Sequence, residues 1–104
     1  MKKYAIIVAG GSGTRFGSTL PKQFVPLGGV PVLMRTIKPF ADYDRDINIV
    51  VALPSEHLTL WGDLCALRNF DVPHKVVEGG ANRFESVRNA LFAINETECL
   101  VAVH

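Results

Sequence analysis

The sequence predicts an α/β fold built on a doubly wound, mostly parallel sheet, and three observations predict it. Short apolar runs rich in β-branched residues alternate with segments of helical periodicity. The apolar runs are continuous rather than alternating, as in strands buried on both faces. A cluster of glycines directly follows the first run. Strands that alternate with helices require right-handed crossovers, so the strands are expected to run parallel, with helices on both faces of the sheet.

The first predicted strand is the apolar run from Tyr4 to Val8, which ends at the glycine cluster. Residues 9–30 contain six of the nine glycines, and this stretch also holds two prolines, so it predicts a long loop without a helix. Loops of this length are usually functional. A helix is expected after Pro31, which suits a first helical turn, and Pro39 is expected to end or kink it. Its apolar residues at roughly helical spacing are Val32, Leu33, Ile37 and Phe40.

The rest of the chain repeats the unit of strand and helix. The predicted strands are 47–53, 74–77 and 99–103. Ser55 is the expected N-cap of a helix over 56–68, and Asn82, after a turn at 78–81, is the expected cap of another. The apolar positions of these two helices are Leu60, Leu64 and Leu67 in the first, and Val87, Ala90, Leu91 and Ile94 in the second.

The expected strand order, in sequence numbering of the four strands, is 3-2-1-4. In such sheets ligands bind beyond the carboxyl ends of the strands where the winding reverses, here between strands one and four. The glycine cluster leaves strand one at this point. Strand four ends at His104, the last residue, so its own loop to the crevice is missing and the strand would form an exposed edge. The sequence therefore predicts a Rossmann-like sheet truncated after its fourth strand, and we expect a fragment.

Composition limits the function classes. The 104 residues are 48% hydrophobic and 20% charged, which allows one core and leaves no room for a second domain. A net charge of +1 disfavours nucleic acid and membrane surfaces as the main partner. The apolar run near the N-terminus is shorter than a signal core, so a cytoplasmic location is expected. Cys65 and Cys99 form no CxxC pattern and are interpreted as small core residues.

The histidines and large aromatic residues point to no further site. The histidines lack metal-ligand spacing and are interpreted as surface or strand-end residues, and the aromatic residues of helical or helix-end segments are interpreted as packing. These residues are His57, His74 and His104, and Trp61, Phe70 and Phe92.

The glycine loop from Ala9 to Gly17 is the strongest chemical feature. Glycines after a strand let backbone N–H groups approach phosphate oxygens closely, because no Cβ intervenes. A Walker A loop needs a lysine directly after a glycine, which is absent here. The dinucleotide fingerprint matches Gly11 and Gly13 but meets Phe16 where its third glycine belongs, and no acidic residue closes a second strand at the usual distance.

Two cations accompany this loop. Arg15 and Lys22 are separated by seven positions, on a segment that Pro21 stiffens. Fixed cations beside phosphate-binding amides suit a reaction in which negative charge builds on phosphoryl oxygens. On spacing alone, the alternative that both are solvated surface charges stays open.

At these residues the chain resembles a known family. The segments 8–17, 20–24 and 27–33 look like the N-terminal half of 2-C-methyl-D-erythritol 4-phosphate cytidylyltransferases, and 78–88 and 101–104 resemble that family's next two motifs in the right order. The resemblance covers essentially the whole chain. Ribitol-5-phosphate cytidylyltransferases share most of these motifs and are the close alternative.

The resemblance implies transfer of a cytidylyl group from CTP to methylerythritol phosphate, with release of pyrophosphate, in non-mevalonate isoprenoid synthesis. It implies Mg²⁺ as cofactor. Arg15 and Lys22 match the family's cations that stabilise the charged α-phosphate. From the residues alone, Arg83 and Ser86 would be interpreted as an exposed first helical turn. The residues that match the family's substrate site are Ala9, Gly10, Gly11, Gly13 and Thr14 on the CTP phosphate side, and Gly79, Gly80, Ala81, Asn82, Arg83 and Ser86 on the cytosine and ribose side.

The same resemblance shows what this chain lacks. In the family, the residue after the match to His104 is an aspartate that binds magnesium, and about as much chain again supplies the acceptor phosphate site and a dimer-forming arm. We therefore expect 1–104 to be the N-terminal nucleotide-binding part of one cytidylyltransferase domain, inactive alone. The implied partners are CTP and a sugar-alcohol phosphate, with a homodimer in the full-length family. A non-catalytic nucleotide-binding module and an NAD-binding domain remain alternatives.

Overall fold

The computed structural model describes residues 2–9, 24, 26–27, 29–94 and 99–104, with the backbone alone at Leu27, Cys99 and Leu100. The central sheet has four parallel strands, in the order β5-β4-β1-β6. This is the predicted order. The strands are β1 (Lys2–Val8), β4 (Asn48–Leu53), β5 (Lys75–Glu78) and β6 (Cys99–Val103).

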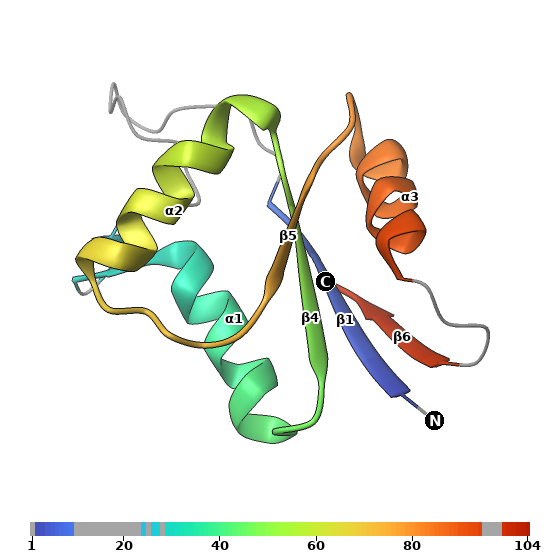
Figure 1. The fold of residues 1–104 in the computed structure, drawn as a ribbon, viewed down its shortest axis with the longest axis horizontal. Helices are drawn as coiled ribbons and strands as arrows, with labels where there is room; N and C mark the ends of the chain where they lie inside the picture. Colours follow the sequence, from blue (N-terminus) through green and yellow to red (C-terminus); the bar gives the residue numbers. More distant parts are fainter. Residues whose placement is uncertain (1, 10–23, 25, 28, 95–98) are drawn as a thin grey trace.

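Helices cover both faces of this sheet, as predicted. Helices α1 (Val32–Tyr43) and α2 (Leu58–Leu67) lie on one face and α3 (Arg83–Ala93) lies on the other (Figure 1). Neighbouring strand residues alternate between the two faces, so Ile7 belongs to the core under α1 and α2, and Ile6 belongs to the core under α3.

A short hairpin lies at the end of the segment 9–30, for which a long loop without a helix was expected, and it extends to Pro31, which was expected in the first helical turn. Strand β2 (Pro26–Leu27) pairs antiparallel with β3 (Val30–Pro31). Gly29, in the turn, has φ +84°, a conformation that glycine adopts readily. Two-residue strands are too short to show hydrophobic alternation, which is why the sequence pattern does not reveal them.

Pro39 was expected to end or kink helix α1. The helix does not end there and continues to Tyr43. Pro39 lacks an N–H group, so one intrahelical hydrogen bond is lost. The proline is exposed, whereas Leu33 and Ile37 are completely buried on the other side of the helix. The helix therefore tolerates the proline because its packing is on the opposite face.

The predicted helix over 56–68 divides into two parts. A 3₁₀ turn, η2 (Ser55–His57), precedes α2, and Ser55 makes no capping bond to the backbone. The buried face of α2 is centred on Trp61, which is 1% exposed, and the predicted Leu60 and Leu64 are partly buried against the same core. Leu67 lies six residues further on, about 120° around the helix, and is 77% exposed.

Helix α3 begins as predicted, but fewer of its apolar side chains are buried than predicted. The Asn82 side chain accepts a hydrogen bond from the backbone N–H of Glu85 at 2.9 Å, which confirms the N-cap. Ala90 is completely buried, but Leu91 is 45% exposed. The packing role expected for Phe92 is wrong, because this residue is 78% exposed.

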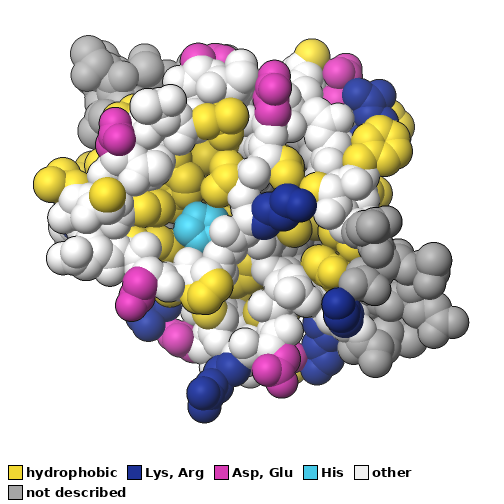
Figure 2. All heavy atoms as spheres, viewed as in Figure 1, with side chains coloured by type: hydrophobic (Ala, Val, Ile, Leu, Met, Phe, Trp, Pro, Cys, Tyr) yellow, Lys and Arg dark blue, Asp and Glu magenta, His cyan; other side chains and the backbone are white. Residues whose placement is uncertain are grey.

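The core is unequal on the two sides of the sheet. Of the described residues, the cluster under α1 and α2 includes Ile7, Phe24, Leu33, Ile37, Val51, Leu53 and Trp61, whereas the cluster under α3 consists of Ile6, Val50 and Ala90. Cys65 packs against the larger cluster, as expected, and burial raises the pKa of its thiol. In the face shown in Figure 2, apolar side chains gather in the middle and charged ones lie mainly around the rim.

Candidate functional site

Three segments meet at the carboxyl edge of the sheet. The backbone N–H of Ala9 donates to the carbonyl of Ala52 at 3.0 Å, and that of Gly79 donates to the carbonyl of Leu53 at 2.6 Å. The carbonyl of His104 accepts from the N–H of Val8 at 3.2 Å, on the opposite side of β1. The end of β4 thus holds the starts of the two glycine-containing segments on its two sides, about 10 Å apart at two strand spacings.

The loop segment 9–24, which contains the glycine loop, starts and finishes at buried residues. Ala9 and Phe24 are each 1% exposed. The predicted site residues between them lie outside the described residues, and their roles stay predictions: Gly10, Gly11, Gly13, Thr14, Arg15 and Lys22.

Phe24 is a residue whose importance the sequence analysis missed. Its ring stacks on the indole of Trp61, with centroids 5.5 Å apart and planes 22° apart. The ring of His57 also contacts it, edge-on at 5.7 Å. The signal available in the sequence was an aromatic residue within a glycine- and proline-rich loop, where exposed polar residues are common.

The second glycine-containing segment, residues 79–82, forms a tight turn before α3. The backbone N–H of Gly80 donates to the hydroxyl oxygen of Ser86 at 3.0 Å, and the N–H of Ser86 donates to the carbonyl of Asn82 at 3.0 Å. Ser86 is 2% exposed, so the interpretation as an exposed helical turn fails for Ser86 and holds for Arg83, which is exposed. The Ser86 hydroxyl therefore holds the backbone of the turn from its buried side.

Steric contacts exclude a Cβ at Gly80 and leave little space for one at Gly79. A Cβ on Gly80 would lie 2.3 Å from the Cβ of Glu85. A Cβ on Gly79 would lie 3.0 Å from the Ser86 hydroxyl oxygen. Asn89, which the sequence analysis did not single out, donates from its side-chain nitrogen to the carbonyl of Glu78 at 3.1 Å and ties α3 to the end of β5. Ala81 and Asn82 are exposed beside these residues, at the edge of the sheet that Ala9 also reaches.

The described residues do not provide a metal site. No group of three or more His, Cys, Asp or Glu among them is placed to hold an ion. Mg²⁺ prefers carboxylate and other oxygen ligands, so the described side chains do not fit this cofactor by themselves. The ring of His104 lies against Phe40, with centroids 5.8 Å apart.

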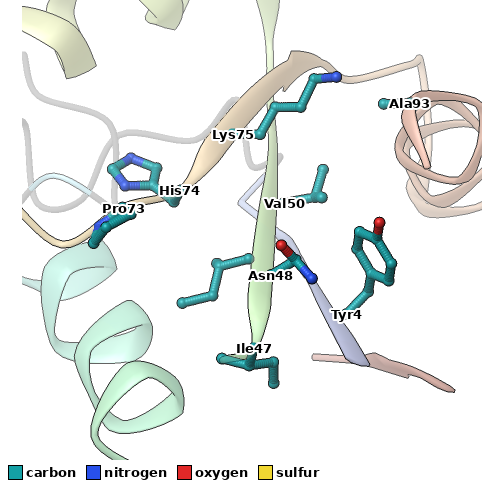
Figure 3. A pocket seen from close by; sticks show the side chains of 9 residues that line it. Tyr4, Ile47, Asn48, Val50, Pro73, His74, Lys75 and Ala93 are labelled. Carbon is teal, nitrogen blue, oxygen red and sulfur yellow. The ribbon is translucent and has the colours of Figure 1, made fainter. Parts of the chain in front are cut away.

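A hollow of about 420 Å³ lies at the other end of the sheet (Figure 3). It is formed at the amino ends of β4 and β5, where Lys75 supplies its cation. Ligands of parallel sheets of this kind bind at the carboxyl ends of the strands, so we place the candidate site there and not in this hollow. The lining residues are Tyr4, Ile47, Asn48, Ile49, Val50, Pro73, His74, Lys75 and Ala93.

Together, the parallel sheet order and the two glycine-containing segments that start at its carboxyl edge place the chain in the doubly wound α/β class, whose members bind ligands at that edge. Comparison with known proteins identifies the family. The family model described as 2-C-methyl-D-erythritol 4-phosphate cytidylyltransferase (IspD) matches residues 3–104. The chain belongs to this family.

Individual relatives agree with this assignment. The chain is 50% identical over 103 residues to a 2-C-methyl-D-erythritol 4-phosphate cytidylyltransferase of Azobacteroides pseudotrichonymphae, covering 99% of this chain and 46% of the relative. It is 50% identical over 104 residues to the protein of the same name in Bacteroides thetaiotaomicron, covering 100% and 47%. The chain thus spans about half the length of these curated relatives.

A solved structure confirms the fold. The 4-diphosphocytidyl-2C-methyl-D-erythritol synthase of Anaerococcus prevotii superimposes with a TM-score of 0.76 at 24% identity, over 99% of this chain and 42% of that one. At this identity the likeness supports the fold alone. Within the described part of the chain, no helix has the length and apolar character needed to cross a membrane.

Proposed function

We propose that residues 1–104 are the nucleotide-binding N-terminal part of a single domain that transfers a cytidylyl group from CTP to 2-C-methyl-D-erythritol 4-phosphate. Pyrophosphate is the other product, and the reaction belongs to non-mevalonate isoprenoid synthesis. The observation that carries the proposal is the bonding of Ala9 and Gly79 to consecutive carbonyls at the end of β4. The names of the relatives favour methylerythritol phosphate over ribitol phosphate as the acceptor.

In the proposed reaction, an oxygen of the acceptor phosphate attacks the α-phosphorus of CTP. The bond from that phosphorus to the bridging oxygen of the β-phosphate breaks, and pyrophosphate leaves with the electron pair. Negative charge grows on the transferring and leaving oxygens, so fixed cations lower the barrier without moving a proton. Arg15 and Lys22 have this role in the proposal.

The two motifs have different tasks in this proposal. The backbone N–H groups of the loop at Gly10, Gly11 and Gly13, with Thr14, receive the triphosphate, because amides without a neighbouring Cβ can approach its oxygens. The turn from Gly79 to Arg83 receives cytosine and ribose. The shape of that turn is fixed from behind by Ser86, whose hydroxyl oxygen holds the Gly80 N–H.

Further parts of the proposal rest on the family. The complete enzyme uses Mg²⁺, which neutralises phosphate charge when bound, and no described cluster of this chain could hold it alone. It binds CTP and a sugar-alcohol phosphate, forms a homodimer and works in the cytoplasm. The isolated 104 residues are inactive, and pyrophosphate released from CTP by this chain alone would overturn that statement.

A chimera tests the proposed function. This chain would be joined to the remaining half of the Bacteroides thetaiotaomicron relative, and pyrophosphate release from CTP and methylerythritol phosphate would be measured, with the intact relative as the reference. We expect activity in the chimera and a loss of about 100- to 1,000-fold for Arg15→Ala or Lys22→Ala.

The matched control is Lys38→Ala, an exposed lysine on α1 that pairs with Asp42 at 3.3 Å and that the proposal does not use. It should leave the rate unchanged. A folded chimera without activity, or equal rates for all three variants, would overturn the proposed function.

A further inference from the structure

An aromatic cluster that includes Phe24, the last residue of the loop segment 9–24, has no role in the proposed chemistry. It joins Phe24 to Trp61 on α2 and to His74, which precedes β5. Trp61 and Phe24 are each 1% exposed. The cluster thus connects Phe24 to helix α2 and to the segment that precedes β5.

Hydrogen bonds fix the orientation of the indole in this cluster. The Trp61 Nε1–H donates to Nε2 of His74 at 3.1 Å. Nδ1 of His74 lies 2.8 Å from the carbonyl of Val72. An indole N–H only donates and a carbonyl only accepts, so His74 is held as the neutral tautomer with its proton on Nδ1. The imidazole therefore links the indole to the backbone before β5.

The orientation of the indole determines where Phe24 can lie. The two rings are offset-stacked, an arrangement that has a defined geometry and contributes beyond simple burial. Phe70 closes another side of the indole, edge-on at 6.1 Å, and also borders His74. With Ala9 fixed to β4 at the other end, Phe24 is the point at which the loop is fixed again to the core.

Two peptide links join Lys22 to Phe24 in the sequence, so a constraint on the backbone at Phe24 acts close to Lys22 along the chain. We propose that Phe24, Trp61 and His74 form a positioning unit for the Lys22 end of the glycine loop, and that occupation of the loop by a nucleotide triphosphate is transmitted to Trp61. This inference rests on the proposed function, because it assumes that the loop binds CTP. The three residues act through the loop and do not touch the nucleotide.

The first test uses the unaltered chain, in which Trp61 is the single tryptophan. CTP binding would be followed by calorimetry and by tryptophan fluorescence in the same buffer with magnesium. We expect the emission of Trp61 to change with the same saturation curve as the heat. Calorimetric saturation without a change in emission would overturn the inference and leave the proposed function standing.

The second test compares two identical substitutions in the cluster. Phe24→Leu and Phe70→Leu each remove a ring contact with Trp61, but only Phe24 belongs to the loop segment. We expect Phe24→Leu to weaken CTP binding about three- to tenfold, the range that one aromatic contact allows, and Phe70→Leu to change it less than twofold. Melting temperatures should fall for both variants.

A third variant covers the case in which Phe24→Leu does not fold. Trp61→Phe keeps an aromatic ring against Phe24 and removes the N–H donor to His74. It should weaken CTP binding, and equal affinities of this variant, Phe70→Leu and the unaltered chain would overturn the inference. If the unaltered chain binds no CTP, the titration is repeated on the chimera with the Bacteroides thetaiotaomicron relative, and a folded chimera that binds no CTP would overturn the proposed function and this inference together.

Discussion

The two faces of the sheet differ in how completely they are covered. On the side of α1 and α2, residues such as Ile37 and Leu53 are completely buried and Trp61 is 1% exposed. On the side of α3, Phe84 is 74% exposed on the helix, and Val101 and Val103 on β6 are 38% and 46% exposed. We infer that most of the stability of this chain resides on the first face.

This difference also separates the two motifs. The glycine loop is fixed to the well-packed face through Phe24, whereas the turn from Gly79 to Asn82 precedes the sparsely packed α3. On the second side, hydrogen bonds of Ser86 and Asn82 hold the turn and the start of α3. We therefore expect core substitutions to cause the largest losses of stability on the face of α1 and α2. On the face of α3, we expect substitutions in the turn and in the helix cap to cause the largest losses.

The largest expected effect tests the comparison directly. Ile37→Ala should lower the free energy of unfolding by about 2–5 kcal/mol, because Ile37 is completely buried and its removal leaves a cavity. Leu91→Ala removes a similar volume from α3, where the side chain is 45% exposed, and should cost less than half as much. Urea unfolding of both variants measures this difference, and equal losses would contradict the comparison.

The next effect concerns the turn on the α3 side. Gly80→Ala should destabilise the chain by about 1–3 kcal/mol, since the new Cβ would meet the Cβ of Glu85 at 2.3 Å. The control is Gly62→Ala on α2, where a Cβ has open space and alanine favours the helix, so a gain of about 0.4–1 kcal/mol is expected. Thermal melts that show the same sign for both variants would refute the steric role of Gly80.

A smaller effect is expected at the cap of α3. Asn82→Ala removes the acceptor of the Glu85 N–H and should cost about 1 kcal/mol. Asn82→Asp keeps an acceptor at the same place and should retain most of the stability. Unfolding curves of the two variants provide the measurement, and an alanine variant as stable as the aspartate variant would show that the cap does not contribute.

The smallest effect is electrostatic. Lys3 Nζ and Asp44 Oδ2 lie 2.9 Å apart, and the hydrogen bond from Lys3 lowers the pKa of Asp44. The pair therefore stabilises the fold above the pKa that Asp44 has in the unfolded chain, and this contribution is lost as the pH falls through the lower folded value. Asp44→Asn should flatten the acid side of the curve of melting temperature against pH.

The same pair has an alkaline limit. Asp44 raises the pKa of Lys3, so the stabilisation is present at neutral pH and is lost only as the pH rises through the raised pKa of Lys3. The control is Asp42→Asn, which removes the exposed pair with Lys38 at 3.3 Å within α1. A larger acid-side change in this control than in Asp44→Asn would contradict the assignment.

Much of the fold was predictable because its signals are local. Continuous apolar runs predicted the four strands, crossover handedness predicted their order, and the side-chain chemistry of Asn82 predicted its cap. The exposure of Leu67 and Phe92 was not predictable, because periodicity shows that a residue is apolar and not whether a neighbouring element covers it. The persistence of α1 through Pro39 likewise depends on tertiary packing of the opposite face.

Of the candidate site, the sequence predicted the edge of the sheet at which the two motifs start and less of the detail. It placed the site between β1 and β6, which stays a prediction, and the bonds of Ala9 and Gly79 to β4 show that both motifs start at the carboxyl edge. The burial of Ser86 and its bond to Gly80 join residues six positions apart through a turn, and no sequence pattern gives that contact. The link from Phe24 to His74 through Trp61 joins three separate elements and was visible only in three dimensions.

The central claim is that the carboxyl edge of this sheet binds CTP. Calorimetric titration with CTP, ATP and NADH in the presence of magnesium tests it most directly, on the chain and on its chimera with the Bacteroides relative. We expect saturable binding that is tighter for CTP than for ATP, and no binding of NADH. Tighter binding of NADH than of CTP, or no binding of CTP by the folded chimera, would contradict the claim.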